Sequence, residues 1–119
     1  MTTTTRTDWQ PRPGAILLVD LEPVRGTEQK GIRPALVVSD PNMNQLTRRV
    51  IVCPITRNPH PWPTKVFLPA GLPVAGAVLV DQVRSIDRAA RILRSPGHAP
   101  DDIVAEVRGK LRTLLGFTA

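Results

Sequence analysis

The sequence lacks several features on which common classes of site depend. It has one cysteine, Cys53, so it can form no internal disulfide and no cysteine-based zinc site. It has no apolar run long enough to cross a bilayer. It also has no His-x-x-x-His pair, no paired-aspartate motif and no Gly-Lys-Ser/Thr phosphate loop. Metal and nucleotide chemistry therefore have no support, and we expect no cofactor.

Aromatic residues are also scarce, with two tryptophans, two phenylalanines and no tyrosine. Trp62 is the one candidate for stacking on a nucleobase, although a loop residue folded onto the domain is the commoner situation. The two histidines, His60 and His98, lie close to prolines. We expect both at the surface rather than acting as catalytic bases.

Acidic residues are outnumbered by basic ones. The 16 Lys and Arg against 10 Asp and Glu give a net charge of +6, which favours a polyanionic partner, nucleic acid before a membrane surface. The many Arg, Pro, Ala and Gly residues are also what a GC-rich genome produces, so charge alone does not decide the partner. Residues 1–12 are polar and lack the apolar segment of a signal peptide. We predict a flexible tail over 1–12, one domain over 13–119, and a cytoplasmic protein.

Short runs rich in Val, Ile and Leu alternate with gaps rich in Gly, Pro and Asn, which is typical of a β-rich chain. They predict strands over residues 15–21, 35–39, 50–55, 65–68, 77–83 and 85–86, and helical turns over 42–47 and 88–93. Their spacing indicates a small, coiled antiparallel barrel.

The C-terminal segment predicts a helix that packs on the core. Its apolar residues fall at helical spacing: Ile103, Val104, Val107, Leu111, Leu114 and Leu115. Asp101 and Asp102 suit the positive end of the helix dipole, and Gly116 supplies a stop. The fold class is mainly β with a C-terminal helix (α+β).

The most informative segment is GTEQKGIRP, residues 26–34. Pro34 biases Arg33 toward an extended conformation, which directs a planar, permanently charged fork suited to a phosphate. A solvated hairpin loop is the plain alternative for a basic segment of this type. The other candidates are Thr56, directly after a predicted strand, and the acids Glu28 and Asp81.

Three blocks in order, GAILLVDLEPVRGTEQKGIRPALVVSD, VIVCPIT and VLVDQVRSID, resemble the signature blocks of the MazF/PemK toxins of type II toxin–antitoxin systems. The similarity runs from about residue 13 to 116. It implies an SH3-like antiparallel β-barrel of the CcdB/PemK type, active as a homodimer, with no membrane partner. It also implies a sequence-specific endoribonuclease of the mRNA interferase type and a cognate acidic antitoxin.

The resemblance further implies roles for individual residues. Arg33 and Thr56 match the two catalytic positions, and the RNA contacts fall on Glu28, Gln29, Lys30, Asp81 and Gln82. The loop 57–64 has no fixed family pattern, so the base preference does not carry over.

The residue chemistry agrees with cleavage of RNA by its own 2′-hydroxyl, which requires no metal and no protein nucleophile. Arg33 would supply a forked, charge-assisted pair of hydrogen bonds to the phosphate, and the Thr56 hydroxyl one more. Glu28 would orient Arg33 or take the 2′-hydroxyl proton, and the base and acid stay unassigned. The substrate is expected to be single-stranded, because side chains cannot read the deep groove of duplex RNA.

Two alternatives stay open. One is a non-enzymatic CcdB-like toxin that poisons a protein target such as DNA gyrase. The other is an RNA-binding module that does not cleave.

Overall fold

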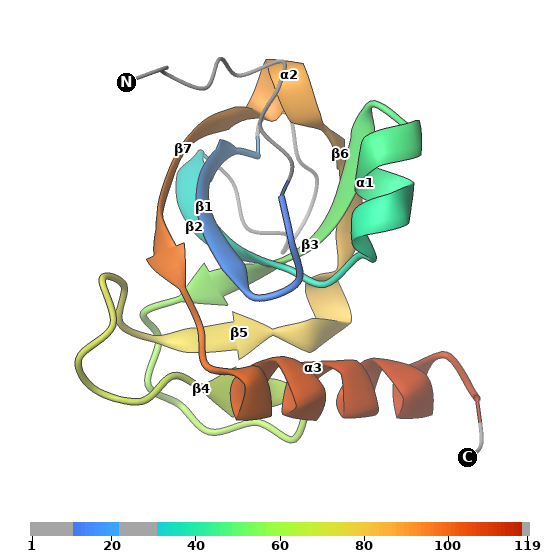
Figure 1. Ribbon diagram of the computed structural model, residues 1–119. Coiled ribbons are helices and arrows are strands. Elements are labelled where there is room, and N and C mark those ends of the chain that lie inside the picture. The colour runs from blue at the N-terminus through green and yellow to red at the C-terminus, as the bar shows by residue number, and fades with distance from the viewer. Residues whose placement is uncertain (1–10, 22–30, 118–119) are drawn as a thin grey trace.

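Seven antiparallel strands and three α-helices make up the described part of the chain, residues 11–21 and 31–117 of a computed structural model (Figure 1). The elements in order are β1 (Ala15–Asp20), β2 (Ile32–Val37), α1 (Pro41–Leu46), β3 (Arg49–Thr56), β4 (Lys65–Phe67), β5 (Ala77–Leu79), the 3-10 helix η1 (Val80–Gln82), β6 (Arg84–Asp87), α2 (Arg88–Arg91), β7 (Ile92–His98) and α3 (Asp101–Leu114).

The strands form one sheet in the order β4-β5-β3-β2-β1-β7, and β6 pairs with β3. Strands β7, β1, β2, β3 and β6 curl into a ring, and the short helix α2 connects the two outer strands β6 and β7 (Figure 1). Within the described residues β6 and β7 do not pair with each other. The predicted barrel is therefore a strongly curled sheet that is not closed by hydrogen bonds.

Buried side chains form two hydrophobic clusters. The inner cluster consists of Ala15, Leu17, Val19, Leu21, Ala35, Val37, Val50, Val52, Ile86 and Ile92. The outer cluster lies between the sheet and α3 and includes Ile16, Leu36, Cys53, Ile55, Val78, Ile103 and Val107. Alternate residues of β1, β2 and β3 thus enter different clusters. Because these strands are buried on both faces, they appear in the sequence as continuous apolar runs.

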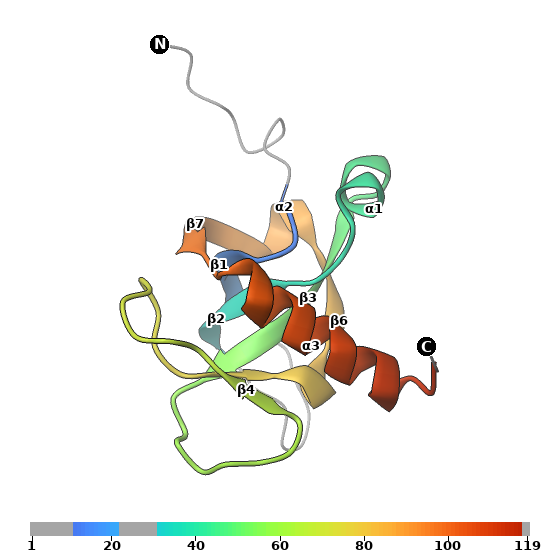
Figure 2. The same cartoon turned by 60° about the horizontal axis from the view of Figure 1, so that its bottom comes forward.

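Helix α3 crosses the outer face of the sheet, as Figure 2 shows. Its C-terminal end agrees with the prediction from Gly116, which has φ +80°. The amides of Gly116 and Phe117 donate to the carbonyls of Thr113 and Arg112 at 3.1 and 2.9 Å. This arrangement satisfies carbonyls that a helix end otherwise leaves without partners.

The predicted apolar stripe of α3 is only partly core. Ile103, Val104 and Val107 are buried, whereas Leu114 and Leu115 are 48% and 62% exposed. The C-terminal end of α3 extends beyond β5 in Figure 1, and Leu114 and Leu115 belong to this end of the helix. No helix in the described residues is long and apolar enough to cross a membrane.

The structure differs from the predicted strands in three places, the first being β2, which begins at Ile32 and not at residue 35. The sequence predicts one strand over 77–83, whereas the chain forms β5 and then turns through η1 before β6 pairs with β3. The sequence predicts no strand over 92–98, because Pro96 and Gly97 are typical of a turn. They are tolerated in β7 since, among the described residues, this strand pairs with β1 alone, and that pairing has two register shifts.

Candidate active site

Arg33 and Thr56 lie on adjacent strands. Strand β2 begins at Ile32, so Arg33 is its second residue and not part of the loop predicted from the sequence. The pair Ala35↔Pro54 fixes the register of β2 and β3. Continuing this register by two residues sets Arg33 opposite Thr56. Directly opposite residues of antiparallel strands have their side chains on the same face.

The pairing of β2 with β3 ends at Ala35↔Pro54. The Val38 amide donates to the Ile51 carbonyl, and hydrogen-bonded pairs alternate along antiparallel strands, so the next such pair beyond the ladder would join Pro34 to Ile55. Pro34 has no amide hydrogen to donate to β3. Beyond Pro54, Thr56 pairs with Ala77 of β5 on the other edge of β3. Arg33 and Thr56 thus lie just beyond the last pair of the β2–β3 ladder, where β3 continues with β5.

The Thr56 hydroxyl is held in place. The residue is 7% exposed, and its Oγ1 accepts a hydrogen bond from the amide of Asn58 at 3.2 Å. A hydroxyl has one hydrogen to donate and two lone pairs that accept. Because Asn58 occupies a lone pair, the hydrogen of Thr56 is left for another acceptor, such as a phosphate oxygen.

Gly76 lets the start of β5 approach the backbone of Thr56 closely. It has φ +132°, and a β-carbon at this position would lie 2.2 Å from the Thr56 carbonyl oxygen. Any other residue would push the two segments apart. Sequence reasoning missed this residue. Its only signal is a glycine directly before a predicted strand.

Asp81 and Gln82 lie on η1, which follows β5 on the opposite edge of β3 from β2. Two strand spacings, about 10 Å, separate the β2 and β5 edges. Burial raises the pKa of the Cys53 thiol to about 12, and the nearby Asp81 carboxylate contributes to this rise. Arg33 and Thr56 therefore lie on the neighbouring strands β2 and β3, whereas Asp81 and Gln82 follow β5, on the opposite edge of β3 from β2.

The remaining predicted residues divide into two groups. Glu28, Gln29 and Lys30 lie outside the described residues. His60 and His98 are exposed, as predicted. In residues 11–21 and 31–117, no three His, Cys, Asp or Glu side chains gather into a group that could hold a metal ion.

The fold and the site together define a class of small proteins in which a curled β-sheet carries a C-terminal helix and an Arg–Thr pair on adjacent strands. Residues 12–115 match the family model described as the PemK-like, MazF-like toxin of type II toxin–antitoxin systems, and the chain belongs to this family.

Individual relatives agree with this assignment. The chain is 38% identical over 106 residues to Endoribonuclease PemK of Escherichia coli, covering 86% of this chain and 80% of that protein. MazF from Deinococcus radiodurans is 43% identical, with a TM-score of 0.86 over 92% of this chain and 100% of that one. The MazE–MazF complex of the same organism gives 38% identity and a TM-score of 0.80, covering 93% of this chain and 100% of that one.

These comparisons confirm the family and the mainly β fold with a C-terminal helix that the sequence predicts. They do not favour the CcdB-like alternative, because the relatives are named endoribonucleases.

Proposed function

We propose that this protein is the toxin of a type II toxin–antitoxin system and that it cuts single-stranded RNA at specific sequences. The observation that carries the proposal is the pairing of β2 with β3, the strands that hold Arg33 and Thr56, whose register would set these two residues opposite each other if it continued two residues beyond Ala35↔Pro54. The relatives named as endoribonucleases support the same reaction.

In the proposed reaction, the 2′-oxygen of the RNA attacks the adjacent phosphorus. A bond forms between this oxygen and phosphorus, and the bond from phosphorus to the 5′-oxygen of the next nucleotide breaks. The Arg33 guanidinium donates two hydrogen bonds to the phosphate oxygens, and the Thr56 hydroxyl donates a third. These bonds stabilise the charge that grows on the phosphate in the transition state.

Two protons also move. The 2′-hydroxyl loses one and the departing 5′-oxygen gains one. Arg33 is a poor base because its guanidinium stays charged. Glu28 is our candidate for orienting Arg33 or for taking the 2′-hydroxyl proton. Gln29, Lys30, Asp81 and Gln82 are our candidates for holding the RNA on either side of the scissile phosphate.

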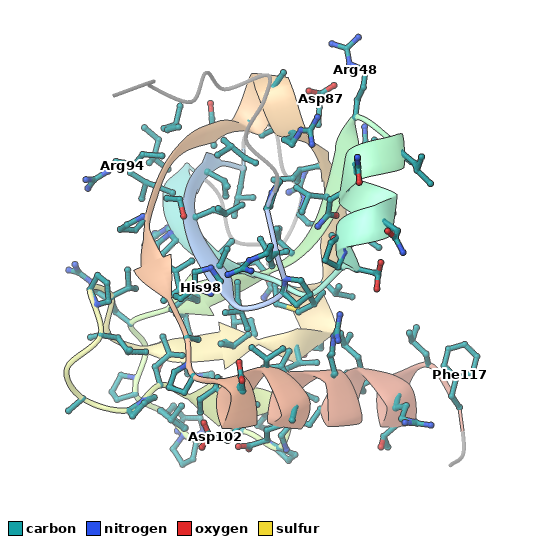
Figure 3. All side chains as sticks on the ribbon, in the orientation of Figure 1. Arg48, Asp87, Arg94, His98, Asp102 and Phe117 are labelled. Carbon is teal, nitrogen blue, oxygen red and sulfur yellow. The ribbon has the colours of Figure 1, made fainter. Side chains whose placement is uncertain are left out.

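The proposal includes two protein partners. We propose a homodimer, which the exposed apolar side chains Leu114, Leu115 and Phe117 support, because such groups favour burial against another surface. Figure 3 shows Phe117 beyond the last turn of α3, where it is 65% exposed. We also propose a cognate acidic antitoxin, supported by the MazE–MazF complex among the solved relatives and by the net charge of +6.

Cleavage of a long RNA of known sequence in excess chelator tests the reaction. We expect activity to persist and to leave a 5′-hydroxyl on one fragment and a 2′,3′-cyclic phosphate, or its hydrolysis product, on the other. A substrate with 2′-deoxyribose at the scissile position should bind but stay intact. Fragments with 5′-phosphates, or activity that disappears with chelator and returns with magnesium, would contradict this mechanism.

A further inference from the structure

The loop between β3 and β4, residues 57–64, begins directly after Thr56 and projects away from the sheet at the bottom of Figure 2. Every second residue in its centre is a proline: Pro59, Pro61 and Pro63. Proline fixes its own φ and restricts the residue before it. The loop therefore has little conformational freedom to lose when it binds a ligand.

Two lysines from outside the loop hold its main chain. The ammonium group of Lys65 in β4 donates to the carbonyls of Asn58 and His60 at 3.1 and 2.7 Å. The ammonium group of Lys110 in α3 donates to the carbonyl of Pro63 at 2.7 Å. Hydrogen bonds from an ionised donor are roughly twice as strong as neutral ones.

Hydrogen bonds inside the loop link it to Thr56. The amide of Asn58 donates to Thr56 Oγ1 at 3.2 Å, and the amide of His60 donates to Asn58 Oδ1 at 2.9 Å. At the far end, the amide of Lys65 donates to the carbonyl of Trp62 at 3.0 Å. The loop is thus folded around the ammonium group of Lys65, and it begins next to the proposed catalytic hydroxyl of Thr56.

The indole of Trp62 stands at the surface of this held loop. It is 58% exposed, so it is not folded onto the domain. The loop has the cation Arg57 and no acidic residue. An exposed aromatic ring on a loop with a cation and no acid fits single-stranded RNA, because bases stack on such rings while cations attract the phosphates.

We propose that the loop 57–64 is a preformed reading element in which Trp62 stacks on a base next to the scissile phosphate. Lys65 is the positioning residue that fixes the loop and thereby determines which RNA sequence is cut. This inference rests on the proposed RNA cleavage. A second copy of this chain covering Trp62 is the competing occupant of the surface.

Fluorescence separates the two occupants. The chain has two tryptophans, so the variant Trp9→Phe leaves Trp62 as its one fluorophore. An RNA oligonucleotide from the mapped cut site, with 2′-deoxyribose at the scissile position, should quench this fluorescence. Trp62→Leu should weaken binding of the same RNA by about 10-fold. Fluorescence that RNA does not change, and that is shielded from acrylamide in a dimer, would overturn the assignment of Trp62 to RNA.

A second experiment tests the role of Lys65. Lys65→Met removes the two hydrogen bonds to the loop, and its cuts on a long RNA are mapped beside those of the unmodified protein. We expect the preference for the best sequence over its single-base variants to fall by about 10-fold. The rate at the best sequence should change less than about 3-fold, and Lys65→Arg should retain part of the preference since it still donates.

The matched control is Arg112→Met. Arg112 is an exposed cation on α3, and its replacement should leave the cut pattern unchanged. An unchanged pattern in Lys65→Met, with cleavage intact, sinks the inference and leaves the proposed function standing. If single-stranded RNA quenched Trp62 fluorescence but the unmodified protein cut no RNA at all, the proposed function would instead end, while base contact by the loop would stand.

Discussion

The two halves of the candidate active site are built in opposite ways. On β2, Arg33 is exposed at the start of a strand, and residues 22–30, which precede this strand, lie outside the described part of the chain. On β3, Thr56 is buried, paired with β5, contacted by Gly76 and hydrogen-bonded to Asn58. The difference follows from side-chain length. A guanidinium reaches a phosphate through several rotatable bonds, whereas a threonine hydroxyl is one bond from its β-carbon, so only a fixed backbone can aim it.

Removal of the charge of Arg33, the exposed member of the pair, should have the largest effect. We expect Arg33→Ala to lower the cleavage rate by roughly 10²-fold or more, because a preorganised charge-stabilising donor is lost. Arg33→Lys should restore little, since an ammonium group cannot reproduce the planar fork. Single-turnover cleavage is the measurement. The melting temperature should stay close to that of the unmodified protein because the side chain is exposed.

At the buried member of the pair, Thr56→Val removes the hydroxyl at nearly constant volume. We expect a rate loss of about 10²-fold with the fold intact. Thr56→Ser, which keeps the hydroxyl, serves as the control and should retain more activity. If Arg33→Ala and Thr56→Val both fold and cut RNA at normal rates, the assigned site is wrong.

Gly76→Ala tests whether the backbone at Thr56 must be held in place for cleavage. The new β-carbon would meet the Thr56 carbonyl, and we expect a rate loss of about 10-fold from misplacement of the hydroxyl. The matched control is Gly71→Ala, which also has positive φ (+92°) but nothing within 4 Å. Combining Gly76→Ala with Thr56→Val should cost little more activity than Thr56→Val alone. Rate losses that multiply in the double variant would show that Gly76 acts elsewhere.

Cys53 lies in the same strand as Thr56, and the reactivity of its thiol reports on how readily β3 opens to solvent. It is buried, and its pKa is raised from 9.0 to about 12. The native thiol should therefore resist iodoacetamide at pH 8 and react only when the protein unfolds. Because the folded pKa exceeds the unfolded one, the free energy of unfolding should fall as pH rises from about 9 toward 12. Rapid labelling of active protein would mean that β3 opens readily.

The smallest effect is expected at Asp87, opposite Arg49 at the other end of β3. A hydrogen bond from the Ala90 amide is the main cause that lowers its pKa below 3.8, and the nearby guanidiniums of Arg48 and Arg49 assist. Figure 3 shows Asp87 and Arg48 together at the α2 end. This stabilisation is present above pH 3.8 and is lost as pH falls through the lowered pKa. Melting temperatures below pH 4 should drop less in Asp87→Asn, and cleavage at neutral pH should not change.

Local patterns in the sequence predict much of this molecule. Apolar runs locate β1, β3 and β4, and helical spacing with Gly116 locates α3 and its end. Arg33 is identified by the proline after it. The sequence does not reveal β7, because its proline is tolerated only where a strand has one neighbour. It also does not reveal the contacts of Gly76, Lys65 and Lys110, since these groups meet main-chain carbonyls, whose positions depend on how the chain folds and not on which side chains it carries.

The lysine contacts with the loop 57–64 have a consequence for how this protein can change over time. Lys65 and Lys110 bind main-chain carbonyls, which every amino acid has. Substitutions at loop positions such as His60 or Trp62 therefore leave the acceptor atoms in place. The loop can acquire new side chains, one mutation at a time, without a compensating mutation in β4 or α3. Descendants of this gene can then diverge in their target sequence while inheriting the same scaffold.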